Sequence, residues 1–208
     1  MANKKIFTDI YISNFWRNEE TRSGVGSTLE YTENLRRQLP VLFKEYGIKR
    51  VLDAPCGDFN WMKHVLSSLD GYIGGDIVKE LIDENNRLYG REGIGFQELD
   101  ITQDKLPEAD LMICRDCLFH LPVTESMKFI KNFQESNIKY LLITSHTNAT
   151  ANDGIVEGEF NFINLMIKPY NFPTDYLYAI DDWIEGYPER KMYMWSRDQI
   201  LGIKTEEK

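Results

Sequence analysis

Short apolar runs alternate with longer amphipathic segments through the middle of the chain. Five of these runs have the length of buried strands: 50–53, 71–76, 95–99, 110–114 and 140–145. Helical spacing of apolar positions predicts three helices between them, at 59–69, 78–89 and 123–137. Strands and helices that alternate in this way build a parallel sheet covered on both faces. The pattern therefore predicts an α/β protein with a doubly wound, Rossmann-like sheet.

A further helix is predicted before the first strand. Ser27 and Glu30 have the spacing of a capping box, which satisfies the free N–H groups of a first helical turn. Gly47 stands where a helix would stop. Pro40 is expected to break or kink this helix because it has no N–H to donate. Leucines recur roughly at helical spacing between these signals: Leu29, Leu35, Leu39 and Leu42.

The periodicity changes after residue 145. Residues 146–174 show no clean period and are rich in Asn, Gly and Phe. Two strand-like runs follow, at 176–184 and 191–196, and the Gly186 and Pro188 between them predict an antiparallel hairpin. We expect one domain over 1–208 with four parts: an N-terminal lid and helix (1–46), a sheet core (47–145), an insertion (146–175) and the hairpin with its tail (176–208).

Composition narrows the class of partner. The 208 residues have a net charge of −9 and contain no long basic run, so nucleic acid is not expected as a partner. No segment approaches the roughly 18 apolar residues of a membrane span, so no membrane partner is expected either. The basic N-terminus lacks the apolar stretch of a secretion signal, and three cysteines fit reduced thiols. We therefore expect a cytoplasmic protein.

Two predicted strands end in carboxylates that suit an adenosine-bearing ligand. Asp53 ends the first strand and is followed by a tight turn, Ala54-Pro55-Cys56-Gly57. Gly57 permits a close approach of backbone to a ligand. Asp76 ends the second strand, 19 positions after Gly57, where it can accept the ribose hydroxyls.

The order of elements and four motifs resemble the class I S-adenosylmethionine-dependent methyltransferases. The motifs stand here as Asp53–Asp58, Asp76, Leu99–Thr102 and Ile113–Asp116. The resemblance covers about 28–196 and implies a seven-stranded sheet with a C-terminal antiparallel hairpin. It is weakest at the first motif, which keeps only one glycine of the usual pattern. Several segments are also similar to small bacterial methyltransferases found near surface-polysaccharide genes.

This resemblance implies S-adenosyl-L-methionine as cofactor. Asp100 would accept from the adenine amino group, Ile101 would pack on the ring, and Arg115 with Asp116 would lie beside the methionine part. The full set of expected cofactor contacts is Trp16, Asp53, Ala54, Pro55, Cys56, Gly57, Asp76, Ile77, Asp100, Ile101, Arg115 and Asp116.

Three side chains are candidate catalytic bases. His120 and Asp116 follow the fourth strand and His146 ends the fifth, so each is expected near the mouth of the pocket. Histidine titrates near neutrality and can remove a proton from a hydroxyl or an amine. For each histidine the alternative is a structural role.

The insertion and the N-terminal lid are expected to flank the pocket. In the insertion, Asn161, Asn164 and Tyr170 are candidate contacts for a polar substrate, while a plain hydrophobic cluster is the alternative. Residues 15–17 and 23–27 are expected to close the other side. The acidic residues Asp181, Asp182 and Glu185 are expected on a solvated face.

A metal site is considered and not favoured. Cys114, Cys117 and His120, with Cys56, are residue types that bind zinc. Cys114 lies in a strand and Cys56 in the predicted cofactor turn, so buried thiols that pack as small apolar groups fit better.

The sequence therefore predicts a methyltransferase for a small-molecule or glycan acceptor, with O-methylation favoured over N-methylation. Two alternatives stay open. One is a nucleotide-linked oxidoreductase, although residues 53–60 lack its G-x-G-x-x-G pattern. The other is a catalytically silent cofactor-binding protein on the same fold. The oligomeric state is not indicated.

Overall fold

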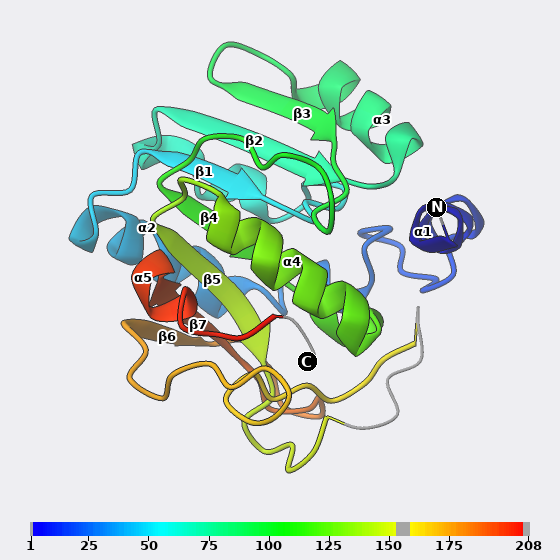
Figure 1. Ribbon diagram of the computed structural model, residues 1–208. Coiled ribbons are helices and arrows are strands. Elements are labelled where there is room, and N and C mark those ends of the chain that lie inside the picture. Colours follow the sequence, from blue (N-terminus) through cyan, green and yellow to red (C-terminus); the bar gives the residue numbers. More distant parts are fainter. Residues whose placement is uncertain (1, 153–158, 206–208) are drawn as a thin grey trace.

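In the residues that the structure describes, seven strands form one sheet in the order β3-β2-β1-β4-β5-β7-β6. The computed structural model describes residues 2–152 and 159–205 (Figure 1). The first five strands pair in parallel, whereas β7 pairs antiparallel with both β5 and β6. This confirms the doubly wound sheet with a C-terminal antiparallel hairpin. The strands are β1 (Arg50–Asp53), β2 (Gly71–Asp76), β3 (Ile94–Glu98), β4 (Leu111–Cys114), β5 (Tyr140–Ser145), β6 (Tyr178–Asp181) and β7 (Lys191–Ser196).

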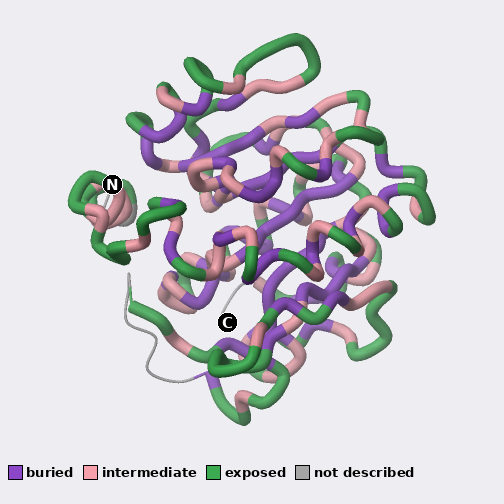
Figure 2. Tube along the Cα trace, turned by 180° about the vertical axis from the view of Figure 1, so that it is seen from behind, coloured by how far each residue is buried: buried purple, intermediate pink, exposed green. Residues whose placement is uncertain are grey.

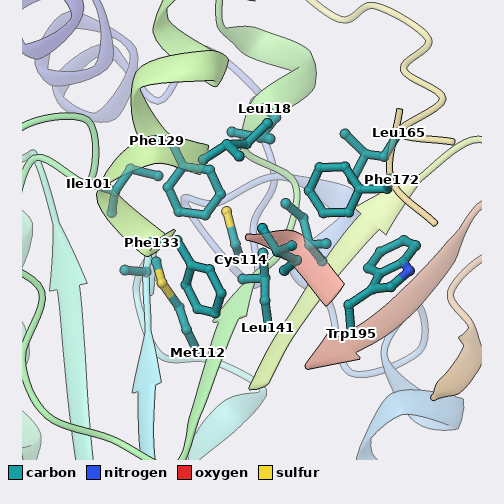
Figure 3. Close-up of a cluster of buried hydrophobic side chains, with 14 of the residues drawn as sticks. Ile101, Met112, Cys114, Leu118, Phe129, Phe133, Leu141, Leu165, Phe172 and Trp195 are labelled. Carbon is teal, nitrogen blue, oxygen red and sulfur yellow. The ribbon is translucent and has the colours of Figure 1, made fainter. Parts of the chain in front are cut away.

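Alternate residues of the central strands enter two separate apolar clusters, one on each face of the sheet. In β4, Met112 and Cys114 face one cluster while Leu111 and Ile113 face the other. This is the period-two geometry of a strand that is buried on both sides. Figure 3 shows the first cluster, where Phe129 and Phe133 of α4 (Val123–Glu135) pack on β4 and β5.

The helix before β1 begins later than its sequence signals suggest. It is α2 (Glu33–Glu45), whose N-cap residue Thr32 makes no side-chain capping bond, so the capping box predicted at Ser27 is wrong. Residues 28–32 form turns instead, held by Thr28 and Thr32 hydroxyls. The predicted break at Pro40 is also wrong, because the helix continues through it. Four apolar side chains of this helix are buried on the sheet, and their burial outweighs one lost hydrogen bond.

The predicted helix at 59–69 is also wrong. Two single-turn 3₁₀ segments, Met62–His64 and Leu66–Ser68, take its place. Phe59 has a left-handed backbone with φ of 59°, which an α-helix excludes. Met62 and Val65 are still buried, because side chains three apart share a face in a 3₁₀ turn as they do in an α-helix.

The remaining predicted helices are confirmed with small changes of boundary. They are α3 (Lys79–Tyr89) and α4, and a short α5 (Arg197–Ile200) follows β7. An N-terminal helix that was not predicted, α1 (Ala2–Ser13), lies to one side of the sheet and is more exposed than the strands (Figures 1 and 2). None of the helices in the described part of the chain is long and apolar enough to cross a membrane.

The insertion contributes to the core. Ile163, Leu165, Tyr170 and Phe172 are buried in the same cluster as α4, and Phe172 packs edge-on against Trp195 of β7 (Figure 3). These residues therefore form the hydrophobic cluster that the sequence left as an alternative to a substrate contact.

The packing of α2 gives a first prediction. Leu39 is fully buried, whereas Val41 in the same helix is 52% exposed. We expect Leu39→Ala to lower the free energy of unfolding by about 2–5 kcal/mol, through lost burial and the cavity left behind. Urea denaturation followed by circular dichroism measures this change. Val41→Ala is the matched control and should change stability by less than about 0.5 kcal/mol. Equal losses in the two variants would contradict this account of α2.

Candidate active site

A pocket lies at the carboxyl ends of the parallel strands. Strand order reverses around β1, which is flanked by β2 and β4, and open α/β sheets bind ligands at such a point. All positions predicted to contact a cofactor except Ala54 line this pocket: Trp16, Asp53, Pro55, Cys56, Gly57, Asp76, Ile77, Asp100, Ile101, Arg115 and Asp116. Ala54 is fully buried in the core and does not line it.

The turn after β1 is held to the end of β2. The Gly57 N–H donates to Asp76 Oδ2 at 3.2 Å, and the Cys56 N–H donates to the Gly75 carbonyl at 2.9 Å. Asp76 Oδ1 accepts a second backbone bond, from Val78 at 3.0 Å. Burial raises the pKa of Asp76 to about 6, although these backbone bonds oppose the rise. Asp76 is therefore an ionised acceptor at neutral pH, with lone pairs left for further donors.

Asp53 is a buried carboxyl group on the floor of the pocket. Its Oδ2 accepts a hydrogen bond from the Tyr72 hydroxyl at 2.8 Å. Burial raises the pKa of Asp53 to about 7, against the opposing effects of this hydrogen bond and of the Arg115 charge. Protonated and ionised forms of Asp53 therefore coexist at neutral pH.

The loop after β3 forms a second side of the pocket. Asp100 Oδ1 accepts from both the backbone and the hydroxyl of Thr102, so the carboxylate is fixed in orientation. Ile101 is buried, and its carbonyl accepts from the Asn132 side chain of α4 at 2.8 Å. Apolar residues of α1 and of the segments that follow β3 and β4 also line the pocket: Phe7, Ile10, Tyr11, Leu99 and Leu121.

The N-terminal segment closes the pocket through Asp58, a contact that sequence reasoning missed. Asp58 Oδ1 accepts from the Thr21 and Ser23 hydroxyls at 2.8 and 3.2 Å, and Oδ2 accepts from the Arg22 N–H at 2.8 Å. In return, the Asp58 N–H donates to Ser23 Oγ at 3.0 Å. Arg22, Ser23 and Ser27 line the pocket, and the last two belong to the segment 23–27 that was expected to flank it. The partners lie 35 to 37 positions apart, so no local pattern marks them.

Three buried charges and the half-buried Asp116 meet at the β4 side of the pocket. Arg115 donates to both oxygens of Asp182 at 2.9 Å and to the Gly26 carbonyl at 2.6 Å. Arg190 donates to Asp182 at 3.3 Å and to Asp116 at 2.7 Å. Asp182 is 1% exposed, so the predicted solvated face is wrong at this position. It is correct for Asp181 and Glu185, which are exposed.

Asp116 is held as an ionised carboxylate. Its backbone is left-handed, with φ of 53°, and its Oδ1 accepts from the Thr144 hydroxyl at 3.3 Å. Burial alone would raise the pKa of Asp116, but Arg115 and Arg190 more than offset this, and the pKa lies below its usual value. A carboxylate paired in this way is a weak base.

Of the two histidines considered as bases, His120 is the one that lines the pocket. Its Nδ1 lies 2.9 Å from the Glu159 carbonyl oxygen, which can only accept, so Nδ1 carries the proton. Nε2 is then the basic nitrogen. Burial lowers the pKa of His120 below 6.5, although the Glu159 hydrogen bond and the Asp116 charge oppose this, so the ring is neutral at pH 7.

His146 does not line the pocket. It is fully buried and packs against Phe119, Phe160 and Phe162. Its Nδ1 accepts from the Ile163 N–H at 3.3 Å, which occupies the basic nitrogen of the ring. Burial lowers the pKa of His146 to about 4. The structure therefore gives His146 no route to act as a base.

The three candidate substrate contacts in the insertion also lie outside the pocket. Asn164 is buried and donates to the Thr147 and Ala149 carbonyls, which folds the insertion onto the end of β5. Asn161 donates to the Phe119 carbonyl at 3.0 Å, and Tyr170 lies in the core. Each of these side chains has a structural contact instead.

The cysteines do not form a metal site within 2–152 and 159–205. Cys56 and Cys114 are buried, and Cys117 is half-buried at the pocket wall. No group of three or more His, Cys, Asp or Glu side chains in these ranges has the arrangement of metal ligands.

Comparison with known proteins identifies the fold. No protein-family model and no curated sequence matches the chain. Solved methyltransferases do match its structure. Human N-acetylserotonin methyltransferase, in complex with S-adenosylmethionine, aligns over 93% of this chain with a TM-score of 0.64 and 17% identity. This chain spans 59% of that one.

Two bacterial enzymes align over nearly their whole length. The N-methyltransferase NodS from Bradyrhizobium japonicum, in complex with S-adenosylhomocysteine, has a TM-score of 0.68 and 15% identity, covering 90% of this chain and 97% of that one. Magnesium protoporphyrin IX methyltransferase from Synechocystis, with the same ligand, has a TM-score of 0.65 and 14% identity, covering 93% and 99%. The chain therefore has the fold of the S-adenosylmethionine-dependent methyltransferases.

The turn after β1 gives the second prediction. Gly57 has φ of 54°, and a Cβ placed there would lie 2.3 Å from Ser23 Oγ. Gly57→Ala should therefore cost the left-handed strain of about 1–2 kcal/mol and also displace Ser23. Gly47→Ala is the matched control, since φ there is 64° and nothing lies within 4 Å. Thermal unfolding should show the larger loss for Gly57→Ala. Equal losses would mean that the Ser23 contact does not constrain this turn.

Proposed function

We propose that this protein is an S-adenosylmethionine-dependent methyltransferase that methylates a hydroxyl group of a small-molecule or glycan acceptor. The observation that supports S-adenosylmethionine as the cofactor is the charge of the pocket lining. Four aspartates line the pocket, Asp53, Asp76, Asp100 and Asp116, against the two arginines Arg22 and Arg115. Asp182 balances Arg115 and Arg190 balances Asp116, which leaves three aspartates against Arg22. Such a wall favours a ligand with a net positive charge, as a sulfonium has.

The same wall disfavours the dinucleotide of an oxidoreductase. A diphosphate is usually held at the N-terminus of the helix after β1. Here that helix is replaced by 3₁₀ turns, and the carboxylate of Asp58 stands at the turn. The methyltransferase fold and the anionic pocket therefore agree.

The residues of the pocket fit the parts of the proposed cofactor. Asp76 would accept the ribose hydroxyls, as the second strand-end acid does in this class of fold. Asp100 and Ile101 would hold the adenine, and Asp53 with the turn 55–57 would face the methionine part. Trp16 and Ser23 of the N-terminal segment also line the pocket and would exclude water.

When bound, the cofactor supplies an electrophilic methyl group. This chain has to orient the acceptor and remove its proton, and orientation alone is worth roughly 7–11 kcal/mol of barrier. Neutral His120 is the proposed base: Nε2 takes the hydroxyl proton while Nδ1–H stays bonded to Glu159. The proposal of O-methylation follows from this neutral base in reach of the pocket. A glycan acceptor and a cytoplasmic location stay predictions from the sequence.

Calorimetric titration with S-adenosylhomocysteine tests the cofactor. Asp76→Ala should weaken binding by about 10-fold to 100-fold, because a charge-assisted hydrogen bond is lost. Asp110→Ala is the matched control: its carboxylate also accepts two backbone N–H bonds, from Lys49 and Arg50, but it does not line the pocket. NAD should not bind. Binding of NAD, or no binding of S-adenosylhomocysteine to the unmodified protein, would overturn the proposal.

The base is tested with a hydroxyl acceptor found by screening with radiolabelled cofactor. His120→Gln should lower kcat by roughly 10²–10⁴-fold and leave the affinity for S-adenosylhomocysteine nearly unchanged. Because burial lowers the pKa of His120, kcat should rise with pH through a midpoint below 6.5 and be flat near neutrality. His146→Gln is the comparison variant. A larger loss of kcat in His146→Gln would show that the wrong histidine was chosen.

A further inference from the structure

The network of Arg115, Asp116, Asp182 and Arg190 lies partly inside and partly outside the pocket. Arg115 and Asp116 line the pocket, whereas Asp182 and Arg190 do not. The side chains of Arg115 and Asp182 are 4% and 0% exposed, and that of Arg190 is 7% exposed. Water therefore screens these three charges weakly, and it screens Asp116, which is 22% exposed, more strongly. Each pocket-lining charge is matched by an opposite charge behind it: Asp182 pairs with Arg115, and Arg190 pairs with Asp116.

The tyrosine and histidine side chains around the network add no charge to this balance, and the nearby Asp53 carboxyl group is common to all the variants compared below. Tyr31 lies under both guanidinium groups, with ring-centroid distances of 5.9 Å to Arg115 and 4.8 Å to Arg190. Burial raises the pKa of Tyr31 to about 12, so its hydroxyl is neutral. His120 and His146 are neutral because burial lowers the pKa of each. Two positive and two negative charges thus cancel at the β4 side of the pocket.

Loss of Asp182 or of Arg190, the two partners outside the pocket, would therefore leave a net charge on the pocket wall. Without Asp182, Arg115 and Arg190 would share the single carboxylate of Asp116, at 3.4 and 2.7 Å, which leaves one positive charge in excess. Without Arg190, the Asp116 carboxylate would lose its closest cation, at 2.7 Å, while Arg115 kept Asp182. These two losses have opposite signs, so they should act in opposite directions on a charged ligand.

We propose, on the basis of the proposed function, that Asp182 and Arg190 are specificity-determining residues outside the pocket: they hold its wall at the charge that accepts the cationic sulfonium cofactor. Methyl transfer breaks the carbon–sulfur bond and leaves the electron pair on sulfur, so the cofactor has a net charge of one positive unit and its thioether product has none. A change in wall charge acts on the amino and carboxylate groups of both ligands alike, but on the sulfonium charge of S-adenosylmethionine alone, so it appears in the ratio of the two affinities.

The experiment compares two dissociation constants by calorimetry, one for S-adenosylmethionine and one for S-adenosylhomocysteine. In Asp182→Asn, binding of S-adenosylmethionine should weaken about tenfold more than binding of S-adenosylhomocysteine, the size expected for one unit charge within a protein wall. A general loss of packing weakens both ligands alike and cancels in the ratio. Circular dichroism establishes that the variant is folded.

Asp181→Asn is the matched control. It removes the same charge one residue away, but Asp181 is 59% exposed and pairs with Lys191 at the surface. The ratio of the two dissociation constants should stay within about twofold of the unmodified protein, because solvent screens this charge.

Arg190→Gln keeps the proposal testable if Asp182→Asn does not fold. In Arg190→Gln the wall becomes more negative, so the dissociation constant of S-adenosylmethionine should fall relative to that of S-adenosylhomocysteine. The double variant Asp182→Asn with Arg190→Gln leaves Arg115 opposite Asp116, so its ratio should return toward that of the unmodified protein.

The outcomes separate this inference from the proposed function. Opposite shifts in the two single variants support the inference. Shifts in the same direction, or ratios within twofold in folded variants, overturn it while the methyltransferase proposal stands. If the unmodified protein binds neither ligand, the proposed function fails and the inference fails with it.

Discussion

The burial of Arg115 is the constraint on which the arrangement of the pocket depends. Its guanidinium is 4% exposed and must find acceptors for its donors inside the protein. It finds them in Asp182, which follows β6, and in the carbonyl of Gly26, in the N-terminal segment. The Arg115 side chain, at the end of β4, therefore holds both the N-terminal segment and the segment after β6 beside the pocket. Because a buried ion pair is no more stabilising than a well-packed apolar pair, its value here lies in placement and in the charge it leaves on the wall.

The second fixed point is the turn after β1. Asp58 accepts three hydrogen bonds from residues 21–23, and its own N–H donates to Ser23. The backbone can carry these bonds only because Gly57 adopts a left-handed conformation directly before Asp58. The first motif thus does two things at once: it presents backbone to the pocket on one side and holds the N-terminal lid on the other. This explains how a turn with one glycine still forms a closed site.

The features that the sequence predicted depend on local patterns. Apolar strand runs, and the acids Asp53 and Asp76 that end two of them, follow from period and position alone, and the pocket contains both acids. Helix boundaries were less secure. The apolar spacing at 59–69 suits a 3₁₀ turn as well as an α-helix, and the left-handed Phe59 that decides between them leaves no mark in the sequence. Likewise, Ser27 does not begin a helix, because the Thr28 hydroxyl forms a turn there: it donates to the Val25 carbonyl and accepts from the Tyr31 N–H.

The burial of Asp182 follows from the alternation of inward and outward residues along β6. Ile180 is buried, Asp181 is exposed and Asp182 is buried again, so the alternation of β6 continues one residue beyond its end. Two adjacent acids in a strand cannot both face solvent when one face of that strand covers the core. The inward acid then requires a buried cation, because an unpaired buried carboxylate is too costly. Arg115 and Arg190 are the cations that meet it, so the period of one edge strand implies a charged network at the centre of the sheet.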